Sequence, residues 1–221
     1  MRKLLLLCFM FLLASTGVAS NAYASHNELG STQILETADS RKACVDPVIE
    51  NPFTQFGDNL DYVLAPDGNF DGNVSGWQLF GGAHIVETDK GRSVEIPEDG
   101  VVVSPSMCVD LHFPTFRMYH RTVKQQNGAR VQGKADKSEI RVDVIYLGVP
   151  AKKWEKMKKF KGKDGVSAAN GWMVSESIDL KPELGGKAPG ARQAALRFTA
   201  EDAEEGETVL LDDVYVDPMR R

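Results

Sequence analysis

The segment Leu210-Leu211-Asp212-Asp213-Val214-Tyr215-Val216 lies near the end of this 221-residue chain and has the composition of a β-strand. Branched and aromatic side chains are common in strands, because they pack well on a pleated, half-buried surface. Similar short runs recur upstream between Gly, Asn, Asp and Pro residues, and no long helical period interrupts them. The expected strands are Trp77–Phe80, Ala83–Glu87, Ser93–Ile96, Val101–Ser104, Thr115–Arg121, Ile140–Leu147, Trp172–Ile178, Ala194–Thr199 and Val209–Val216. Many short strands with turn signals between them predict an all-β sandwich of two antiparallel sheets.

Residues 1–24 have the layout of a secretory signal peptide. Arg2 and Lys3 form a basic start, an apolar run covers Leu4 to Leu13, and Ala22-Tyr23-Ala24 is a small-x-small cleavage site. The apolar run is short for a membrane span, and no later segment is apolar enough to cross a bilayer. We therefore predict a secreted, extracellular protein that is cleaved after Ala24. Residues 25–43 would then form a flexible N-terminal segment, and residues 44–221 a single domain.

Charge and cysteine content limit the classes of partner. The sequence has 26 Lys+Arg and 31 Asp+Glu residues, which give a net charge of -5, so an exported nucleic-acid-binding protein is not expected.

Two cysteines, Cys44 and Cys108, remain outside the signal peptide, and in an exported protein two such residues most simply pair. A Cys44–Cys108 disulfide would stabilise the fold by about 4 kcal/mol. A zinc or thiol site is less favoured, because no C-x-x-C and no Cys/His cluster is present.

Alternation along three of the expected strands predicts which side chains face the core. The apolar residues expected inside are Phe116, Met118, Ile140, Val142, Val144, Tyr146, Leu196 and Phe198. The residues expected on the opposite side are Arg117, Tyr119, Arg121, Arg141, Asp143, Ile145, Arg197 and Thr199. Three separate strands thus place arginines away from the core.

Two motifs near opposite ends of the domain carry a family resemblance. Asn69-Phe70-Asp71 and Gly76-Trp77 come first, and Leu211-Asp212-Asp213-Val214 follows after about 140 residues of short strands. With these motifs in this order, the chain resembles the galactose-binding-like superfamily, in particular the jelly-roll carbohydrate-binding modules of families four, nine and twenty-two. It also looks like exported bacterial proteins that combine this module with a cysteine pair. The resemblance covers roughly Tyr62 to Asp217 and implies a jelly-roll β-sandwich.

The resemblance also implies a ligand surface, because such modules bind glycans across one sheet. Here that face would offer Arg117, Tyr119, Arg121, Arg141, Asp143 and Arg197. Guanidinium groups form paired hydrogen bonds with anionic groups, so the four arginines favour acidic sugars. The alternative is a solvated lattice of ion pairs with no ligand.

Members of the superfamily often hold a structural calcium ion, and the matching residues here are Asp71 and Asp212. Asp212 alternates with Leu210, Val214 and Val216, so we expect it to point inward. A buried carboxylate needs a cation or several hydrogen bonds, and calcium prefers oxygen ligands. The alternative is a carboxylate that is satisfied by backbone amides or by an arginine.

No motif indicates an enzyme. A G-x-S-x-G sequence is absent, and the four histidines form no metal-ligand pair. The favoured function is therefore a secreted, non-catalytic carbohydrate-binding module for a glycan or a cell-surface polysaccharide. A second hypothesis is a surface interaction protein that contacts anionic polymers through the lysine-rich loop Lys152–Lys163, and a polysaccharide-active enzyme is a third.

Overall fold

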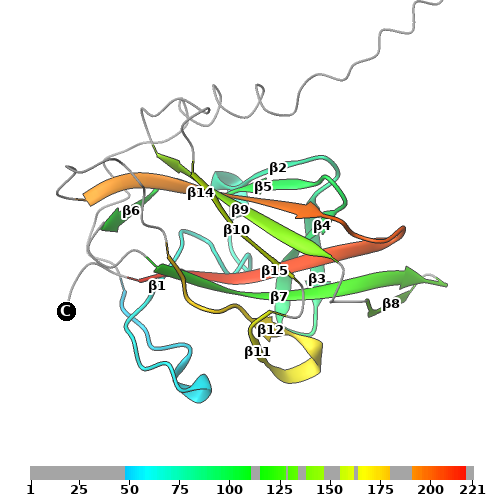
Figure 1. Cartoon of the computed structure of the whole chain (residues 1–221), viewed down its shortest axis with the longest axis horizontal. Helices are drawn as coiled ribbons and strands as arrows, with labels where there is room; N and C mark the ends of the chain where they lie inside the picture. Colours follow the sequence, from blue (N-terminus) through cyan, green and yellow to red (C-terminus); the bar gives the residue numbers. More distant parts are fainter. Residues whose placement is uncertain are drawn as a thin grey trace, which may run out of the picture.

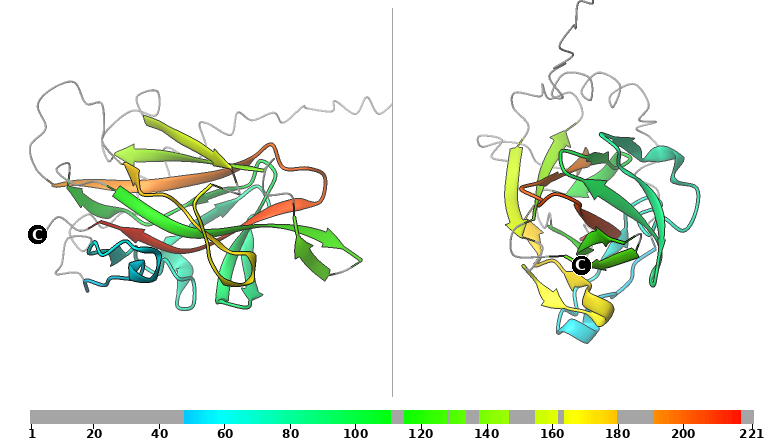
Figure 2. Two further views of the ribbon diagram at one scale, coloured as in Figure 1. Left: turned by 60° about the horizontal axis from the view of Figure 1, so that its bottom comes forward. Right: turned by 90° about the vertical axis from the view of Figure 1, so that its right-hand side faces the viewer.

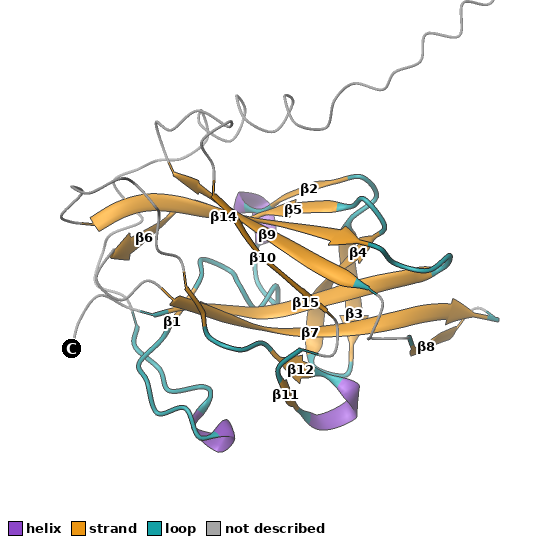
Figure 3. Cartoon of the chain, viewed as in Figure 1, coloured by secondary structure: helices purple, strands orange, loops and turns teal. Residues whose placement is uncertain are grey.

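A computed structural model describes residues 48–110, 115–127, 129–133, 138–146, 155–161, 164–179 and 191–217. These residues form two antiparallel sheets that pack against each other (Figure 1, Figure 3). The predicted all-β sandwich is therefore confirmed. The predicted signal peptide, the segment 25–43 and Cys44 lie outside the described residues, so these assignments and the disulfide stay predictions.

The larger sheet has nine strands in the order β11-β12-β7-β15-β4-β3, with β1 on β15 and with β8 and β13 on β7. The strands on the main path are β3 (His84–Thr88), β4 (Gly91–Pro97), β7 (Thr115–Gln126), β11 (Val166–Ser167), β12 (Met173–Val174) and β15 (Glu207–Val216). The remaining strands are β1 (Val63–Leu64), β8 (Ala129–Gln132) and β13 (Ile178–Asp179).

The smaller sheet has six strands in the order β10-β9-β14-β5-β2, with β6 also paired to β14. These strands are β2 (Gln78–Phe80), β5 (Val101–Val103), β6 (Met107–Asp110), β9 (Glu139–Tyr146), β10 (Glu155–Lys161) and β14 (Ala191–Glu201). Short 3₁₀ turns complete the described elements, namely η1 (Thr54–Phe56), η2 (Val74–Gly76) and η4 (Ala169–Gly171).

The main core lies between the two sheets and follows the predicted alternation. Phe116 and Met118 of β7 are fully buried there, together with Val142 of β9 and Phe198 of β14. Arg141 and Arg197, the strand neighbours of these apolar residues, lie on the other side of their sheet. The period-2 pattern therefore assigned the inward faces of these strands correctly.

The Asn69-Phe70-Asp71 and Gly76-Trp77 motifs build one corner of this core. The rings of Phe70 and Trp77 meet edge to face, with centroids 4.7 Å apart, and the Trp77 Nε1 donates to the Pro66 carbonyl at 2.8 Å. A Cβ atom on Gly76 would lie 2.9 Å from the Pro105 Cγ, so a larger residue would displace the proline. The motif residues are thus needed for packing at this corner.

A β-bulge in β15 changes the face that we expected for Asp212. The pairing of β15 with β7 shifts between Asp212 and Tyr215, and Asp213 has a φ of 45°. Because the bulge adds one residue, Val214 lies in the main core, whereas Asp212 lies on the outer side with Leu210. Asp212 is buried as expected, but the prediction that it shares a face with Val214 and Val216 is wrong.

A second apolar cluster covers the outer face of the nine-stranded sheet. Residues 48–62 and 164–175, cyan and yellow in Figure 2, lie against this face. The cluster contains Phe53, Tyr62, Val86, Tyr119, Val123, Trp172, Val174, Leu210 and Tyr215. The outer side of this sheet is therefore a second packed layer over much of its area.

The lysine-rich segment differs from the loop that we expected. Glu155–Lys161 form strand β10, which pairs with β9 at the edge of the six-stranded sheet. The loop prediction is therefore wrong for these residues. Across the parts of the chain that the structure describes, no helix is long and apolar enough to cross a membrane.

Candidate functional site

The six residues predicted to bind a ligand are divided between the two sheets. Arg117, Tyr119 and Arg121 lie on β7 of the nine-stranded sheet. Arg141 and Asp143 lie on β9, and Arg197 lies on β14, so these three belong to the six-stranded sheet. The main core separates the sheets, and all six side chains point away from it. They therefore form two groups on opposite sides of the sandwich and not the single face that we expected.

Arg117 is buried beneath residues 48–62. Its Nη1 donates to the Asp58 carboxylate at 2.7 Å, and its Nε donates to the Ser175 carbonyl at 2.8 Å. The guanidinium also lies 4.6 Å from the centroid of the Phe53 ring. Burial alone would raise the pKa of Asp58, but hydrogen bonds from Leu60, Tyr62 and Arg117 hold that pKa below its usual value. Arg117 thus joins two covering segments to β7.

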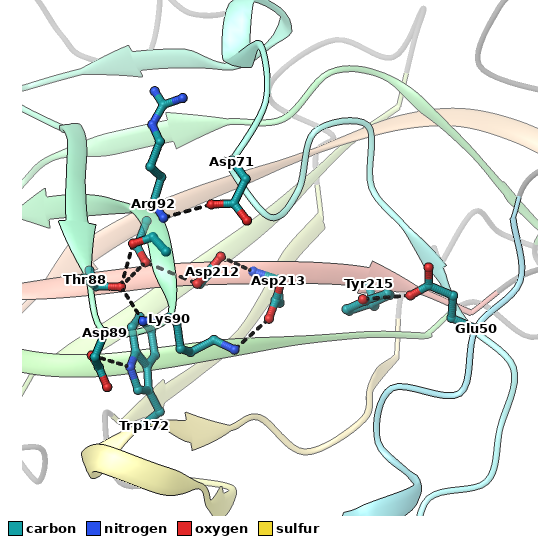
Figure 4. A network of polar contacts seen from close by, with 12 residues as sticks. Glu50, Asp71, Thr88, Asp89, Lys90, Arg92, Trp172, Asp212, Asp213 and Tyr215 are labelled. Atoms are coloured by element: carbon teal, nitrogen blue, oxygen red, sulfur yellow. Dashed lines mark hydrogen bonds and ion pairs between the residues drawn. The ribbon is translucent and has the colours of Figure 1, made fainter.

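Tyr119 and Arg121 make similar contacts. Tyr119 is 8% exposed, and the Lys90 ammonium lies 4.0 Å from the centroid of its ring. Arg121 donates to Asp89 at 2.9 Å and to the Asn170 carbonyl at 3.0 Å, and its guanidinium lies over the Trp172 ring. The indole of Trp172 also donates to Asp89, at 3.3 Å (Figure 4). These side chains are therefore engaged in holding the second layer.

The other three residues form a compact group on the outer face of the six-stranded sheet. Arg197 and Asp143 are direct neighbours across β14 and β9, and the Arg197 Nε donates to the Asp143 Oδ2 at 2.8 Å. The Arg141 Nε lies 3.4 Å from the same carboxylate oxygen, and Arg141 also pairs with Glu201. Asp143 is only 2% exposed, so it is a buried carboxylate between two guanidinium groups. These ion pairs fix the orientation of both arginines.

Two further residues on this face were not among the predicted site residues. Thr199 is the β14 neighbour of Arg141, and its buried hydroxyl has no hydrogen-bond partner among the described residues. Phe80 of β2 packs with the small outer cluster of Val103, Ile145 and Ala195. Alternation within Gln78–Phe80 puts Leu79 on the core side and Phe80 outside, and this pattern was available in the sequence.

The two predicted calcium ligands both contact the start of β4 (Figure 4). The Arg92 amide donates to the Asp71 Oδ1 at 3.0 Å, and the Ser93 hydroxyl donates to the Asp212 Oδ2 at 3.2 Å. Asp212 also accepts from the Asp213 amide at 2.8 Å. Burial, together with the nearby Asp213 charge, raises the pKa of Asp212 to about 8.

A lysine ammonium lies near the last strand, beside Asp212 and Asp213. The Lys90 ammonium lies 2.8 Å from the Asp213 carboxylate and within electrostatic range of Asp212. The described residues contain no group of three His, Cys, Asp or Glu side chains arranged to hold a metal ion. Calcium binding would therefore use Asp71 and Asp212 with main-chain carbonyls, which are suitable oxygen donors.

Comparison with known proteins gives a structural likeness only. No protein-family model matches the sequence, and no curated protein matches it. Among solved structures, the chain is similar to TmCBM61 in complex with β-1,4-galactotriose, with 15% identity and a TM-score of 0.38. This alignment covers 69% of the chain and 96% of the module.

Two other solved structures have similar sequence identities and TM-scores. The xylan-binding module CBM15 is 13% identical with a TM-score of 0.41, and the alignment covers 68% of this chain and 95% of the module. The K3 cleaved adhesin domain of Lys-gingipain from Porphyromonas gingivalis is 11% identical with a TM-score of 0.43, over 68% of this chain and 97% of the domain. The solved structures that are similar to this β-sandwich thus include carbohydrate-binding modules and an adhesin domain.

Proposed function

We propose that this protein binds carbohydrate, without catalysis, on the outer face of its six-stranded sheet. The observation that carries this proposal is the fixed arrangement of Arg141, Asp143 and Arg197 beside the Thr199 hydroxyl, which has no partner in the described part of the chain. Buried polar groups normally have a hydrogen-bond partner, and a sugar hydroxyl is a suitable one for Thr199. The motif resemblance described above supports the same class of ligand.

The chemistry of the face suits sugar hydroxyls. Each guanidinium carries five N–H donors, and Asp143 and Glu201 hold the planes of Arg141 and Arg197 in place. Binding groups that are already ordered lose less conformational entropy when a ligand arrives. Phe80 adds an aromatic ring at the β2 edge of the same sheet.

The opposite side of the sandwich is a weaker candidate for a glycan surface. Arg117 and Tyr119 are 5% and 8% exposed, and they already contact residues of the covering layer. A ligand there would have to displace those residues. We therefore assign Arg117, Tyr119 and Arg121 to folding and restrict the proposed glycan site to the six-stranded sheet.

The proposal includes no hydrolytic step. Glycoside hydrolysis normally requires two carboxyl groups that flank the bond to be cleaved. On this face, Asp143 is shared by two arginines and Glu201 pairs with Arg141, so both carboxylates are committed to ion pairs.

We also propose that Asp71 and Asp212 hold a structural calcium ion. The supporting observation is the buried Asp212 carboxylate, whose two hydrogen-bond donors, Ser93 and the Asp213 amide, are both neutral. A calcium ion there would join the segment after Phe70 to the last strand. Its contribution would be to stability, at a position distant from the proposed glycan face.

A glycan-binding measurement with three variants tests the proposed function. The Thr199→Val substitution keeps the side-chain shape and removes one hydrogen bond, so we expect the affinity to fall by about two- to tenfold. The Arg141→Gln substitution should lower it at least as much. Arg92→Gln, on the other sheet, is the control and should bind like the wild type.

Two results would contradict the proposal. One is full affinity in both Thr199→Val and Arg141→Gln, which would place the site elsewhere. The other is a folded wild-type protein that binds none of a broad panel of neutral and acidic glycans. Export is a separate part of the proposal, and N-terminal sequencing of the secreted protein should begin at Ser25.

A further inference from the structure

The lysine-rich strand β10 lies directly beside the proposed glycan face. In the pairing of β10 with β9, Lys156 is opposite Asp143, Lys159 is opposite Arg141, and Lys161 is opposite Glu139. The register shifts between Lys156 and Lys159. Residues that were expected to lie in a separate loop are therefore the next strand of the same sheet.

Charge is distributed unevenly over these strands. Arg141 and Arg197 are balanced by Asp143 and Glu201, so the described ion pairs on the face leave no net charge. Strand β10 then adds four lysines and a single glutamate, although the whole chain has a net charge of -5. The excess of positive charge thus comes from the β10 segment and not from the arginines.

We infer that β10 and the arginine-bearing face form one binding surface, and that its ligand is a polysaccharide carrying carboxylate or sulfate groups. This inference rests on the proposed carbohydrate-binding function and adds the class of ligand. The arginines and Thr199 would bond hydroxyls and ring substituents, while the β10 lysines attract the charges of the polymer. Strand β10 provides an edge about 20 Å long, along which several sugar units can lie.

A polymer fits this surface better than a membrane does. A flat anionic bilayer would face a large part of a protein whose overall charge is negative, and the repulsion would oppose binding. A single polysaccharide chain can follow one edge of the sheet and avoid the acidic parts of the surface. Lysines on an edge strand also discourage pairing with other strands, and the experiment must separate that role from ligand binding.

The test uses two forms of one polymer, polygalacturonate and its methyl ester, with the mature protein. The two share one sugar backbone, but the carboxyl groups of the ester are methylated and therefore carry no charge. We expect tighter binding to polygalacturonate, and we expect this preference to decrease as salt is added, because exposed charges are screened. Lysine substitutions should not change binding to the neutral ester.

Single-residue variants then test whether the β10 lysines cause the preference for the charged polymer. Lys156→Gln and Lys159→Gln should each weaken binding to polygalacturonate by about two- to fivefold at low salt. Lys159→Arg keeps the charge and should restore the wild-type affinity. Lys124→Gln, which removes one charge from β7 of the other sheet, is the matched control and should have no effect.

The outcomes separate this inference from the proposed function. Equal affinity for the charged polymer and its ester would overturn the inference and leave carbohydrate binding intact. No binding to either form or to any other glycan would overturn both. Lysine-dependent binding to anionic vesicles or DNA, but not to polygalacturonate, would show that the ligand class is wrong.

Discussion

The Arg117→Met substitution tests whether the arginine on β7 holds the second layer in place. Arg117 is buried, and it donates to Asp58 at 2.7 Å and to the Ser175 carbonyl at 2.8 Å. Methionine has a similar length and can cover the Phe53 ring, but it has no donor. The substitution therefore removes two hydrogen bonds while it keeps most of the apolar contact.

The expected loss of folding stability can be worked out from these two hydrogen bonds. A hydrogen bond to a charged group contributes about 1.5–3 kcal/mol, and leaving a buried carbonyl without its donor costs about 1–3 kcal/mol. Asp58 keeps its bonds from the Tyr62 hydroxyl at 2.7 Å and the Leu60 amide at 3.0 Å, which favours the lower half of the range. We expect the free energy of unfolding to fall by about 3 kcal/mol, and the melting temperature to fall by about 10 °C.

Urea unfolding of the mature protein measures this loss, with calorimetry as a second readout. Arg92→Met is the matched control, because the Arg92 side chain makes a single hydrogen bond to the Gly72 carbonyl, at 3.1 Å, near the surface. The Arg92→Met substitution should lower the free energy of unfolding by less than about 1 kcal/mol. Arg117→Met should also retain the glycan affinity of the folded protein. A loss of stability no larger than that of the control, or a loss of binding without a loss of stability, would refute the structural role of Arg117.

Three further predictions concern burial, metal and disulfide. Burial lowers the pKa of His120 from 6.5 to about 4, so its neutral form stabilises the fold above pH 6.5, and this contribution is lost as the pH falls toward 4. Between pH 7 and pH 4.5, the free energy of unfolding of the wild type, measured with urea, should fall by about 2–3 kcal/mol more than that of His120→Gln. An equal fall in the variant would contradict the assignment of this pH dependence to His120. EDTA should lower the melting temperature of the wild type but not that of Asp212→Asn, and a wild type insensitive to EDTA would exclude the calcium ion. Peptide mapping without reduction should recover a Cys44–Cys108 linked pair, and two free thiols would contradict the predicted disulfide.

Local patterns in the sequence predicted the strands and their faces well. In β9, the alternation of Val142 and Val144 with Arg141 and Asp143 was sufficient, because a strand has a fixed side-chain period of two. The same holds for β14, where Phe198 faces the core and Arg197 faces outward. These features depend only on neighbours in the chain.

Features that depend on one extra residue or on distant segments could not be predicted in this way. The bulge in β15 reverses the faces after Asp212, and no residue type in that segment marks its position. The division of the candidate residues between two sheets depends on pairings between strands far apart in the sequence, such as β7 with β15. Burial of Arg117 depends on residues 48–62, which contain almost no strand signal.

The contrast between the two outer faces explains why only one of them is proposed as a ligand surface. Both carry arginines next to aromatic or apolar residues, and the sequence patterns of β7 and β9 do not distinguish them. On β7, each arginine is paired with a group from the covering segments, Asp58 for Arg117 and the Asn170 carbonyl for Arg121. On β9 and β14, the partners found among the described residues are Asp143 and Glu201, which come from the same two strands. Arginines of the first kind join the covering segments to the sheet, whereas those of the second kind form the ordered polar surface on which we propose that the glycan binds.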